Sequence, residues 1–94
     1  MLFSLHCRDK ADHVQLRMDT RERHLAYLTG FAEKIVFGGP MLAEDGKTPI
    51  GSLLVVDFPD KSAAEAFAAG DPYAEAGLFA ETSITPVRQV FPKT

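Results

Sequence analysis

The chain lacks the features that mark membrane-spanning, secreted and nucleic-acid-binding proteins. Its 94 residues hold no apolar run near the roughly 20 residues that a bilayer-crossing helix needs, and the N-terminus lacks the apolar core of a secretion signal. Ten Lys and Arg residues, spread along the chain, stand against 13 Asp and Glu residues. The net charge of -3 provides no basic field for a phosphate backbone. We therefore expect a cytoplasmic protein that binds neither membranes nor nucleic acid.

Cysteine is nearly absent as well. Cys7 is the one cysteine in the sequence, so no internal disulfide can form, which fits a reducing cytosol. It lies in an apolar segment, and no neighbouring pattern would activate its thiol. We expect Cys7 to pack as a small hydrophobic side chain.

Motifs for metals and cofactors are also missing. A catalytic zinc site takes three protein ligands, and the sequence has none of the usual paired spacings of His and Cys. No glycine-rich phosphate loop occurs, and Gly38-Gly39-Pro40 is interpreted as the end of a strand. The sequence predicts a site with no metal and no cofactor.

The first third of the chain predicts a strand followed by a helix. Residues Met1 to Arg8 alternate between apolar and polar side chains, as in a half-buried strand. A helix is expected from Asp19 to about Lys34, with Asp19 and Glu22 as a capping pair and an apolar stripe of Leu25, Leu28 and Ala32. Residues 11 to 18 fit either an extra helical turn or a lead-in.

The rest of the chain predicts a hairpin, a helix and a final strand. Ile35 to Phe37 and Gly51 to Phe58 are expected to pair as a hairpin. Ser62 to Glu65 fits a capping box for a helix that turns Ala63, Ala66 and Phe67 inward and ends at Gly70. Asp71-Pro72 then predicts a short helix to about Gly77, and Thr82 to Phe91 an edge or bulged strand containing Pro86.

The element order is therefore β-α-β-β-α-β within one domain covering residues 1 to 94. We expect an α+β, ferredoxin-like fold: a four-stranded antiparallel sheet with both helices on one face. Leu53 to Val56 put apolar side chains on both faces of the third strand, so the face without helices is not suited to water. The sequence predicts a homodimer that covers this face. The alternative is a monomer that covers it with the loop from Met41 to Ile50.

Three histidines are present, and His24 is the strongest candidate for chemistry. It shares a helix face with Tyr27 and Phe31 at spacings i, i+3 and i+7, beside the core stripe. This semi-buried position is where the proton affinity of a ring can be tuned. His13 lies in a polar segment and is expected to be solvated, whereas His6 in the first strand either lines a pocket or packs.

Three short motifs in register carry a resemblance to a known family. They are Arg21 to Leu28, then Gly39-Pro40-Met41, then Asp71-Pro72-Tyr73. In this order and spacing the chain resembles the YCII-related domain family over essentially its whole length. The resemblance implies a dimeric α-β barrel related to muconolactone isomerase, with His24 and Asp71 as a catalytic pair. It also implies proton-transfer chemistry on small ring compounds, such as lactone isomerisation or halide elimination.

A carboxylate beside an imidazole fixes its tautomer and stabilises the charged ring, so a pair of this kind can act as a general base. We assign His24 as base and Asp71 as its orienting partner, with the reverse roles open. The same residues also have a purely structural interpretation, with Asp71 as a helix N-cap and His24 as a packed ring. The chain is thus either a small lyase or isomerase, or a non-catalytic module that binds a small ligand in the same pocket.

Other residues are weaker candidates for binding a substrate. If the first helix extends backward, Arg17 and Arg21 share a face with His24 and offer a basic approach to an anion, although a solvated charged face is the preferred interpretation. Ser52 offers a hydroxyl at the start of the third strand, and Tyr73 follows the Asp71 motif.

Overall fold

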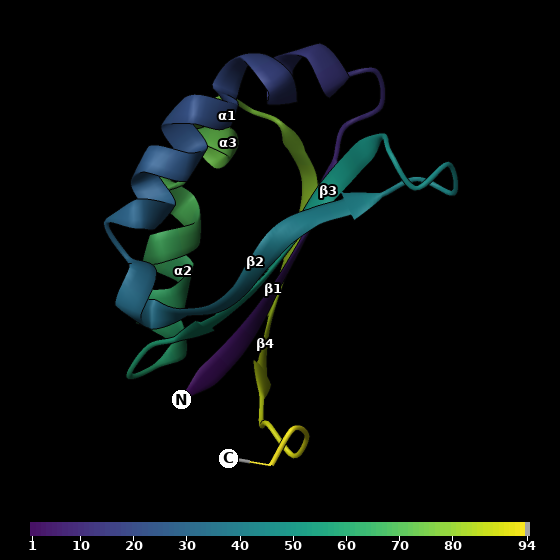
Figure 1. Ribbon diagram of the computed structural model, residues 1–94. Coiled ribbons are helices and arrows are strands. Elements are labelled where there is room, and N and C mark those ends of the chain that lie inside the picture. The colour runs from purple at the N-terminus through teal and green to yellow at the C-terminus, as the bar shows by residue number, and fades with distance from the viewer. Residues whose placement is uncertain (94) are drawn as a thin grey trace.

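The computed structural model describes residues 1–93 as one sheet with helices packed against one of its faces (Figure 1). All neighbouring strands are antiparallel, in the order β2-β3-β1-β4. The predicted ferredoxin-like fold is confirmed. Its elements in chain order are β1 (Leu2–Asp9), α1 (Val14–Thr29), a 3-10 turn η1 (Ala32–Lys34), β2 (Ile35–Leu42), β3 (Pro49–Asp57), α2 (Lys61–Gly70), α3 (Pro72–Glu75) and β4 (Phe79–Val87).

The core lies between the sheet and the helices. β1 alternates as predicted and turns Phe3, Leu5 and Cys7 toward the helices, next to the buried Leu54 and Val56 of β3. Burying a large apolar side chain contributes about 1.5–3 kcal/mol to folding. Around these residues pack the buried side chains of α2 and a ring of half-buried aromatic and aliphatic side chains: Ala64, Phe67, Tyr27, Leu28, Phe31, Ile35, Phe58, Phe79 and Ile84.

Helix α1 differs most from the prediction. It begins at Val14, five residues before Asp19, so residues 14 to 18 are helical and Asp19 is no cap. The Asp19 carboxylate instead accepts a hydrogen bond from Gln15 within the helix. The predicted stripe is correct only at Leu28, which packs against the core: Leu25 and Ala32 are exposed, and the fully buried side chains of α1 are polar.

Strand β2 and helix α2 also depart from the prediction. β2 does not end at Gly38-Gly39-Pro40 but continues to Leu42, and Pro40 is tolerated because β2 is an edge strand. Helix α2 is capped by Asp60, whose carboxylate accepts from the Ala63 backbone N–H, rather than by Ser62. Ala66 is exposed and Ala64 takes the inward position.

The last strand was predicted to be an edge or a bulged strand, and β4 is an edge strand with Pro86 in regular register opposite Phe3. It covers Phe79–Val87, so it begins and ends earlier than the predicted Thr82 to Phe91. Asp71 caps α3 as predicted: its carboxylate accepts from the Tyr73 backbone N–H at 2.9 Å, and Pro72 holds the first helical position.

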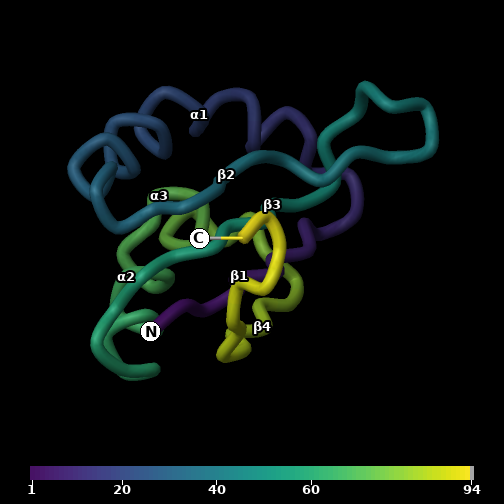
Figure 2. Tube along the Cα trace, turned by 60° about the horizontal axis from the view of Figure 1, so that its bottom comes forward, coloured from purple at the N-terminus to yellow at the C-terminus, as the bar shows by residue number. Residues whose placement is uncertain are grey.

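The face of the sheet away from the helices is uncovered in the chain (Figure 1). The β2–β3 loop extends beyond the end of the sheet rather than folding over this face, and in both views it lies at the end where α1 begins (Figures 1 and 2). Leu53 and Val55 are half-buried there, and Phe37, which pairs with Val55, is 54% exposed. Within residues 1–93, no helix is long and apolar enough to span a membrane.

Candidate active site

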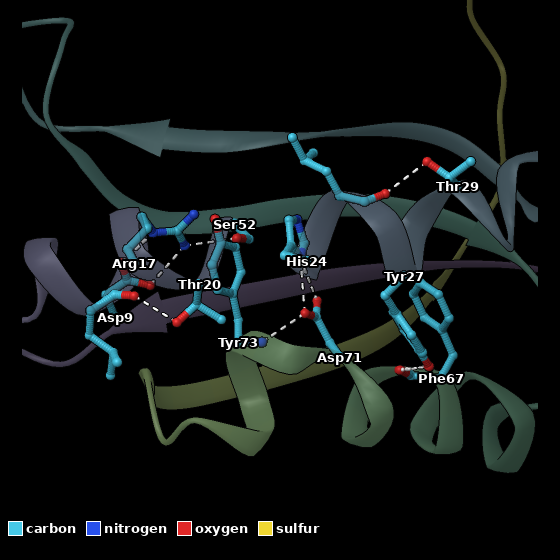
Figure 3. A network of polar contacts seen from close by, with 12 residues as sticks. Asp9, Arg17, Thr20, His24, Tyr27, Thr29, Ser52, Phe67, Asp71 and Tyr73 are labelled. Carbon is cyan, nitrogen blue, oxygen red and sulfur yellow. Dashed lines mark hydrogen bonds and ion pairs between the residues drawn. The ribbon is translucent and has the colours of Figure 1, made fainter. Parts of the chain in front are cut away.

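One face of α1 carries three buried polar side chains, Arg17, Thr20 and His24. They recur at i, i+3 and i+7, the spacing of a single helix face. A buried polar group destabilises the fold unless it is hydrogen-bonded. The Thr20 hydroxyl meets this need within the helix by donating to the Leu16 carbonyl. Arg17 and His24 are held by partners from other elements (Figure 3).

His24 is in direct contact with Asp71, although 47 residues separate them. The imidazole Nδ1 lies 2.8 Å from one carboxylate oxygen and 3.0 Å from the other. Both side chains are more than 90% buried. A carboxylate accepts but does not donate, so Nδ1 carries the proton and Nε2 is left as the basic nitrogen of the neutral ring.

Nε2 of His24 is the ring nitrogen that Asp71 leaves free. It makes no hydrogen bond within residues 1–93, and no buried polar side-chain atom in that range lacks a partner, so Nε2 is reachable by solvent. His24 is one of the residues that line a cavity beside α1. The free nitrogen is therefore available to a molecule bound there.

The imidazole is also fixed on its face. The Tyr73 ring stacks on it with centroids 4.0 Å apart and planes 18° from parallel. The guanidinium carbon of Arg17 lies 4.5 Å from the Tyr73 ring centroid, so Arg17, Tyr73 and His24 form a row (Figure 3). A cation near an aromatic ring and a ring stacked on imidazole both limit rotation of the side chains.

Arg17 is anchored in turn by Asp9 and Ser52. Its guanidinium donates to both oxygens of Asp9, at 2.7 and 2.9 Å, and to the Ser52 hydroxyl at 2.8 Å. Burial acts to lower the pKa of Arg17, but the hydrogen bonds and charge of Asp9 outweigh it and raise the pKa. Arg17 is thus a fixed cation. Burial raises the pKa of Tyr73, against the opposing charges of Arg17 and Arg21, so Tyr73 is a neutral phenol.

The cavity beside these residues has a volume of about 390 Å³, within the range of small-ligand pockets. It lies between α1 and strands β2 and β3. Gly38 and Gly39 line it on the β2 side, so the segment interpreted as a strand end forms part of the cavity wall. The other lining residues are Arg17, Met18, Arg21, His24, Leu25, Leu28, Pro40, Leu42, Lys47, Pro49, Ser52, Leu54 and Tyr73.

The weaker candidates from the sequence, Arg21, Ser52 and Tyr73, all line this cavity. His6 lies on the open face of the sheet and does not. Sequence reasoning missed Asp9, because a carboxylate at the end of a strand carries no local sign of an ion pair eight residues away. It also missed Lys47, which stands in a polar loop with no pattern that points to a site.

Two other expectations concern the reactivity of Cys7 and the presence of a metal site. Cys7 is buried, and burial raises the pKa of its thiol to about 11, so it packs as an unreactive thiol. Within residues 1–93, no three His, Cys, Asp or Glu side chains gather as a metal site would need.

Residues 1–88 match the YCII-related domain model. The chain belongs to the YCII-related family. Protein YciI of Escherichia coli O6:H1 is 35% identical over 98 residues, a match that covers 97% of this chain and all of the relative. An uncharacterised protein of Haemophilus influenzae is 32% identical with the same coverage.

A solved structure is also similar to this chain. It is the 5-chloro-2-hydroxyhydroquinone dehydrochlorinase TftG of Burkholderia phenoliruptrix, in complex with 2,5-dihydroxybenzoquinone. The two structures superimpose with a TM-score of 0.88 at 34% identity, and the match covers 95% of each chain.

Proposed function

We propose that this chain is a small cofactor-independent enzyme that moves protons on a small hydroxylated ring compound, as a lyase or isomerase. The observation that carries the proposal is the free Nε2 of His24 at the wall of a cavity, with Nδ1 held by Asp71. Imidazole is the side chain best suited to take and return a proton near neutral pH.

In this proposal His24 is the base and Asp71 is a positioning residue. The Asp71 carboxylate fixes the tautomer with the proton on Nδ1 and stabilises the imidazolium that forms when Nε2 takes a proton. The opposite assignment has less support. Both Asp71 oxygens face the imidazole, Oδ1 also accepts from the Tyr73 N–H, and Asp71 does not line the cavity.

One imidazole accounts for both reaction types. Nε2 removes a proton from a ring hydroxyl, and the O–H electron pair forms a carbonyl while the ring π electrons shift to a ring carbon. Nε2 returns the proton to that carbon, which completes an isomerisation. If the carbon carries a halogen, Nε2 removes a proton from a second hydroxyl, and the carbon–halogen pair leaves as halide. The products are a quinone and the hydrogen halide, whose proton is the one that Nε2 took from the second hydroxyl. No cofactor takes part, and His24 is neutral again once that proton has left.

The solved relative supports this substrate class, since a dehydrochlorinase of a chlorinated hydroquinone has this fold. The cavity of this chain suits a single ring. Leu25, Leu28 and Leu54 give it apolar walls, and a volume of about 390 Å³ accommodates one substituted ring.

The test is a screen for turnover. The purified chain is incubated with 5-chloro-2-hydroxyhydroquinone, other chlorinated and hydroxylated aromatics, and cyclic lactones, while chloride release and ultraviolet absorbance are followed. We expect catalysed loss of chloride or a double-bond shift with one of these classes, abolished in His24→Asn. Saturable binding of the same compounds without any turnover would instead establish the non-catalytic ligand-binding module.

We also propose that the chain works as a homodimer, with a second copy on the open face of the sheet. Phe37, Leu53 and Val55 lie there, on a face that the chain itself leaves uncovered. Exposed apolar patches of this kind are usual at interfaces. Light scattering at micromolar concentration should give the mass of a dimer, and Val55→Glu should give a folded monomer. A wild-type monomer would refute this proposal.

A further inference from the structure

Positive charge gathers around the cavity although the chain as a whole is acidic. The net charge is -3, yet Arg17, Arg21 and Lys47 all line the cavity. Among the described residues that line it, none is Asp or Glu. A concave site lined by charges of one sign concentrates ligands of the opposite sign.

Two of these three cations have no counter-charge. Arg17 is neutralised by the bidentate contact with Asp9. Arg21 and Lys47 form no ion pair within residues 1–93. Arg21 stands one turn after Arg17 on α1 and three residues before His24, so it projects from the same helix face as the proposed base. Both side chains are exposed, which leaves their charges free for a ligand.

The loop that carries Lys47 has a fixed shape. The Asp45 carboxylate accepts from the backbone N–H groups of Lys47 and Thr48, at 2.8 and 2.9 Å, and from the Thr48 hydroxyl. These hydrogen bonds lower the pKa of Asp45, so it stays ionised and bound to the loop. Gly46, at a φ of 69°, closes the turn by donating to the Ala43 carbonyl. The backbone at Lys47 is therefore held beside the cavity.

We propose that Arg21 and Lys47 form an anion-binding edge of this cavity, and that its ligand is a small planar ring bearing an ionised oxygen, either a phenolate or a carboxylate. The two cations come from separate elements, α1 and the β2–β3 loop, and contact the oxyanion while the ring lies against Leu25, Leu28 and Leu54. This inference rests on the proposed function, which gives a small ring compound as the ligand, and adds that this ring carries a negative charge.

The inference is tested by binding, measured by calorimetry at low ionic strength with three probes. Two carry a negative charge at neutral pH, 2,5-dihydroxybenzoquinone as a vinylogous acid and 2,5-dihydroxybenzoate as a carboxylate. The third, 2,5-dihydroxybenzyl alcohol, is neutral. We expect one or both anions to bind at least about tenfold more tightly than the alcohol, and their affinity to fall with added salt. If only one of the two anions binds, it identifies the source of the charge; if both bind, the edge accepts either oxyanion.

A matched pair of double variants separates local from global charge. R21Q/K47Q removes the proposed anion-binding edge, whereas R23Q/K61Q removes two exposed cations of the same helix α1 and of α2 that do not line the cavity. Both change the net charge equally. R21Q/K47Q should weaken anion binding by about tenfold and leave the alcohol unaffected, since each exposed charge contributes a few-fold. R23Q/K61Q should bind both like the wild type.

Three results would overturn the inference: equal affinity for the neutral and charged rings, no detectable binding of either anion, or equal loss in the two double variants. His24→Asn separates this inference from the proposed catalysis, because it keeps both cations and should still bind the anions. Anion binding without turnover would refute only the proposed function. Turnover together with equal affinity for the charged and neutral rings would refute only the anion-binding edge.

Discussion

Helices α1 and α2 cover the same face of the sheet but bury different kinds of side chain. α2 turns Ala64 and Phe67 inward, and Phe67 packs among other aromatic rings. α1 buries Arg17, Thr20 and His24. Apolar area stabilises a fold simply by leaving water, whereas a buried polar group needs a partner of the right geometry. The packing of α2 therefore depends mainly on buried apolar area, whereas the packing of α1 depends on particular polar contacts.

The difference also explains where the cavity lies. Aromatic side chains fill the space beneath α2, so little room remains there. Beneath α1, Arg17 is bound by Asp9 and His24 by Asp71. On the β2 side, Gly38 and Gly39 line the cavity and have no side chains to fill it. The polar half of the helical layer is thus the half that leaves room for a ligand.

The largest expected effect comes from breaking the polar row at Asp9. Asp9→Ala leaves the Arg17 guanidinium buried without its carboxylate, which should lower the free energy of unfolding by about 3–5 kcal/mol. Urea denaturation measures this change. A loss below about 1 kcal/mol would mean that Arg17 simply turns to solvent, and that the polar row is not held as tightly as its contacts indicate.

The apolar core should instead disfavour a charged side chain, and ionisation of the buried Cys7 thiol tests this. The pKa of this thiol is raised from 9.0 to about 11 by burial, so between these values the unfolded chain loses the thiol proton while the folded chain keeps it. Stability must therefore fall as the pH rises through this window, by about 2–3 kcal/mol. Urea denaturation from pH 8 to 11 should show a shallower decline for Cys7→Ala than for the wild type. Identical declines would contradict a buried thiol.

The smallest effect on stability is expected when α1 is made to resemble α2. The double variant Asp9→Leu with Arg17→Met replaces a buried ion pair by apolar side chains, which is usually neutral or stabilising. Its free energy of unfolding should lie within about 1 kcal/mol of the wild type or above it. If turnover is found, it should fall, because Tyr73 loses the cation on its outer face. A loss of stability as large as that of Asp9→Ala would show that the pair itself stabilises the fold.

The same contrast decides what could be predicted from the sequence. Elements with apolar buried faces were placed to within two residues at each end, β1 from the alternation of its side chains and β3 from its apolar run. The buried face of α1 is polar, so a search for an apolar stripe selected Leu25 and Ala32, which are exposed. The helix start was left undecided for the same reason, and the structure shows that residues 14 to 18 are the extra helical turn.

The site was predicted unevenly. The contact between His24 and Asp71, expected from the family resemblance, is present at 2.8 Å. Hydrophobic periodicity alone could not supply it, because 47 residues separate the two side chains. Continuation of β2 through Pro40 was missed because the sequence does not reveal that β2 is an edge strand, where a missing backbone donor is tolerated. Asp9 and Lys47 reach the site only through the tertiary fold.

The central claim is that the polar face of α1 serves proton transfer more than stability, and His24→Asn tests it most directly. Asparagine keeps an amide donor for Asp71 but has no second nitrogen to carry a proton. The decisive measurement is the pair of values, kcat/KM and the free energy of unfolding, from one preparation of His24→Asn. The matched control is Phe67→Ala on α2.

We predict that His24→Asn lowers kcat/KM by about 10²–10⁴-fold while the free energy of unfolding falls by no more than about 1–2 kcal/mol. Phe67→Ala should do the reverse, losing about 3–5 kcal/mol of stability with kcat/KM of the folded protein largely preserved. A His24→Asn variant that loses several kcal/mol of stability but keeps its kcat/KM would contradict the account, because His24 would then be a core side chain.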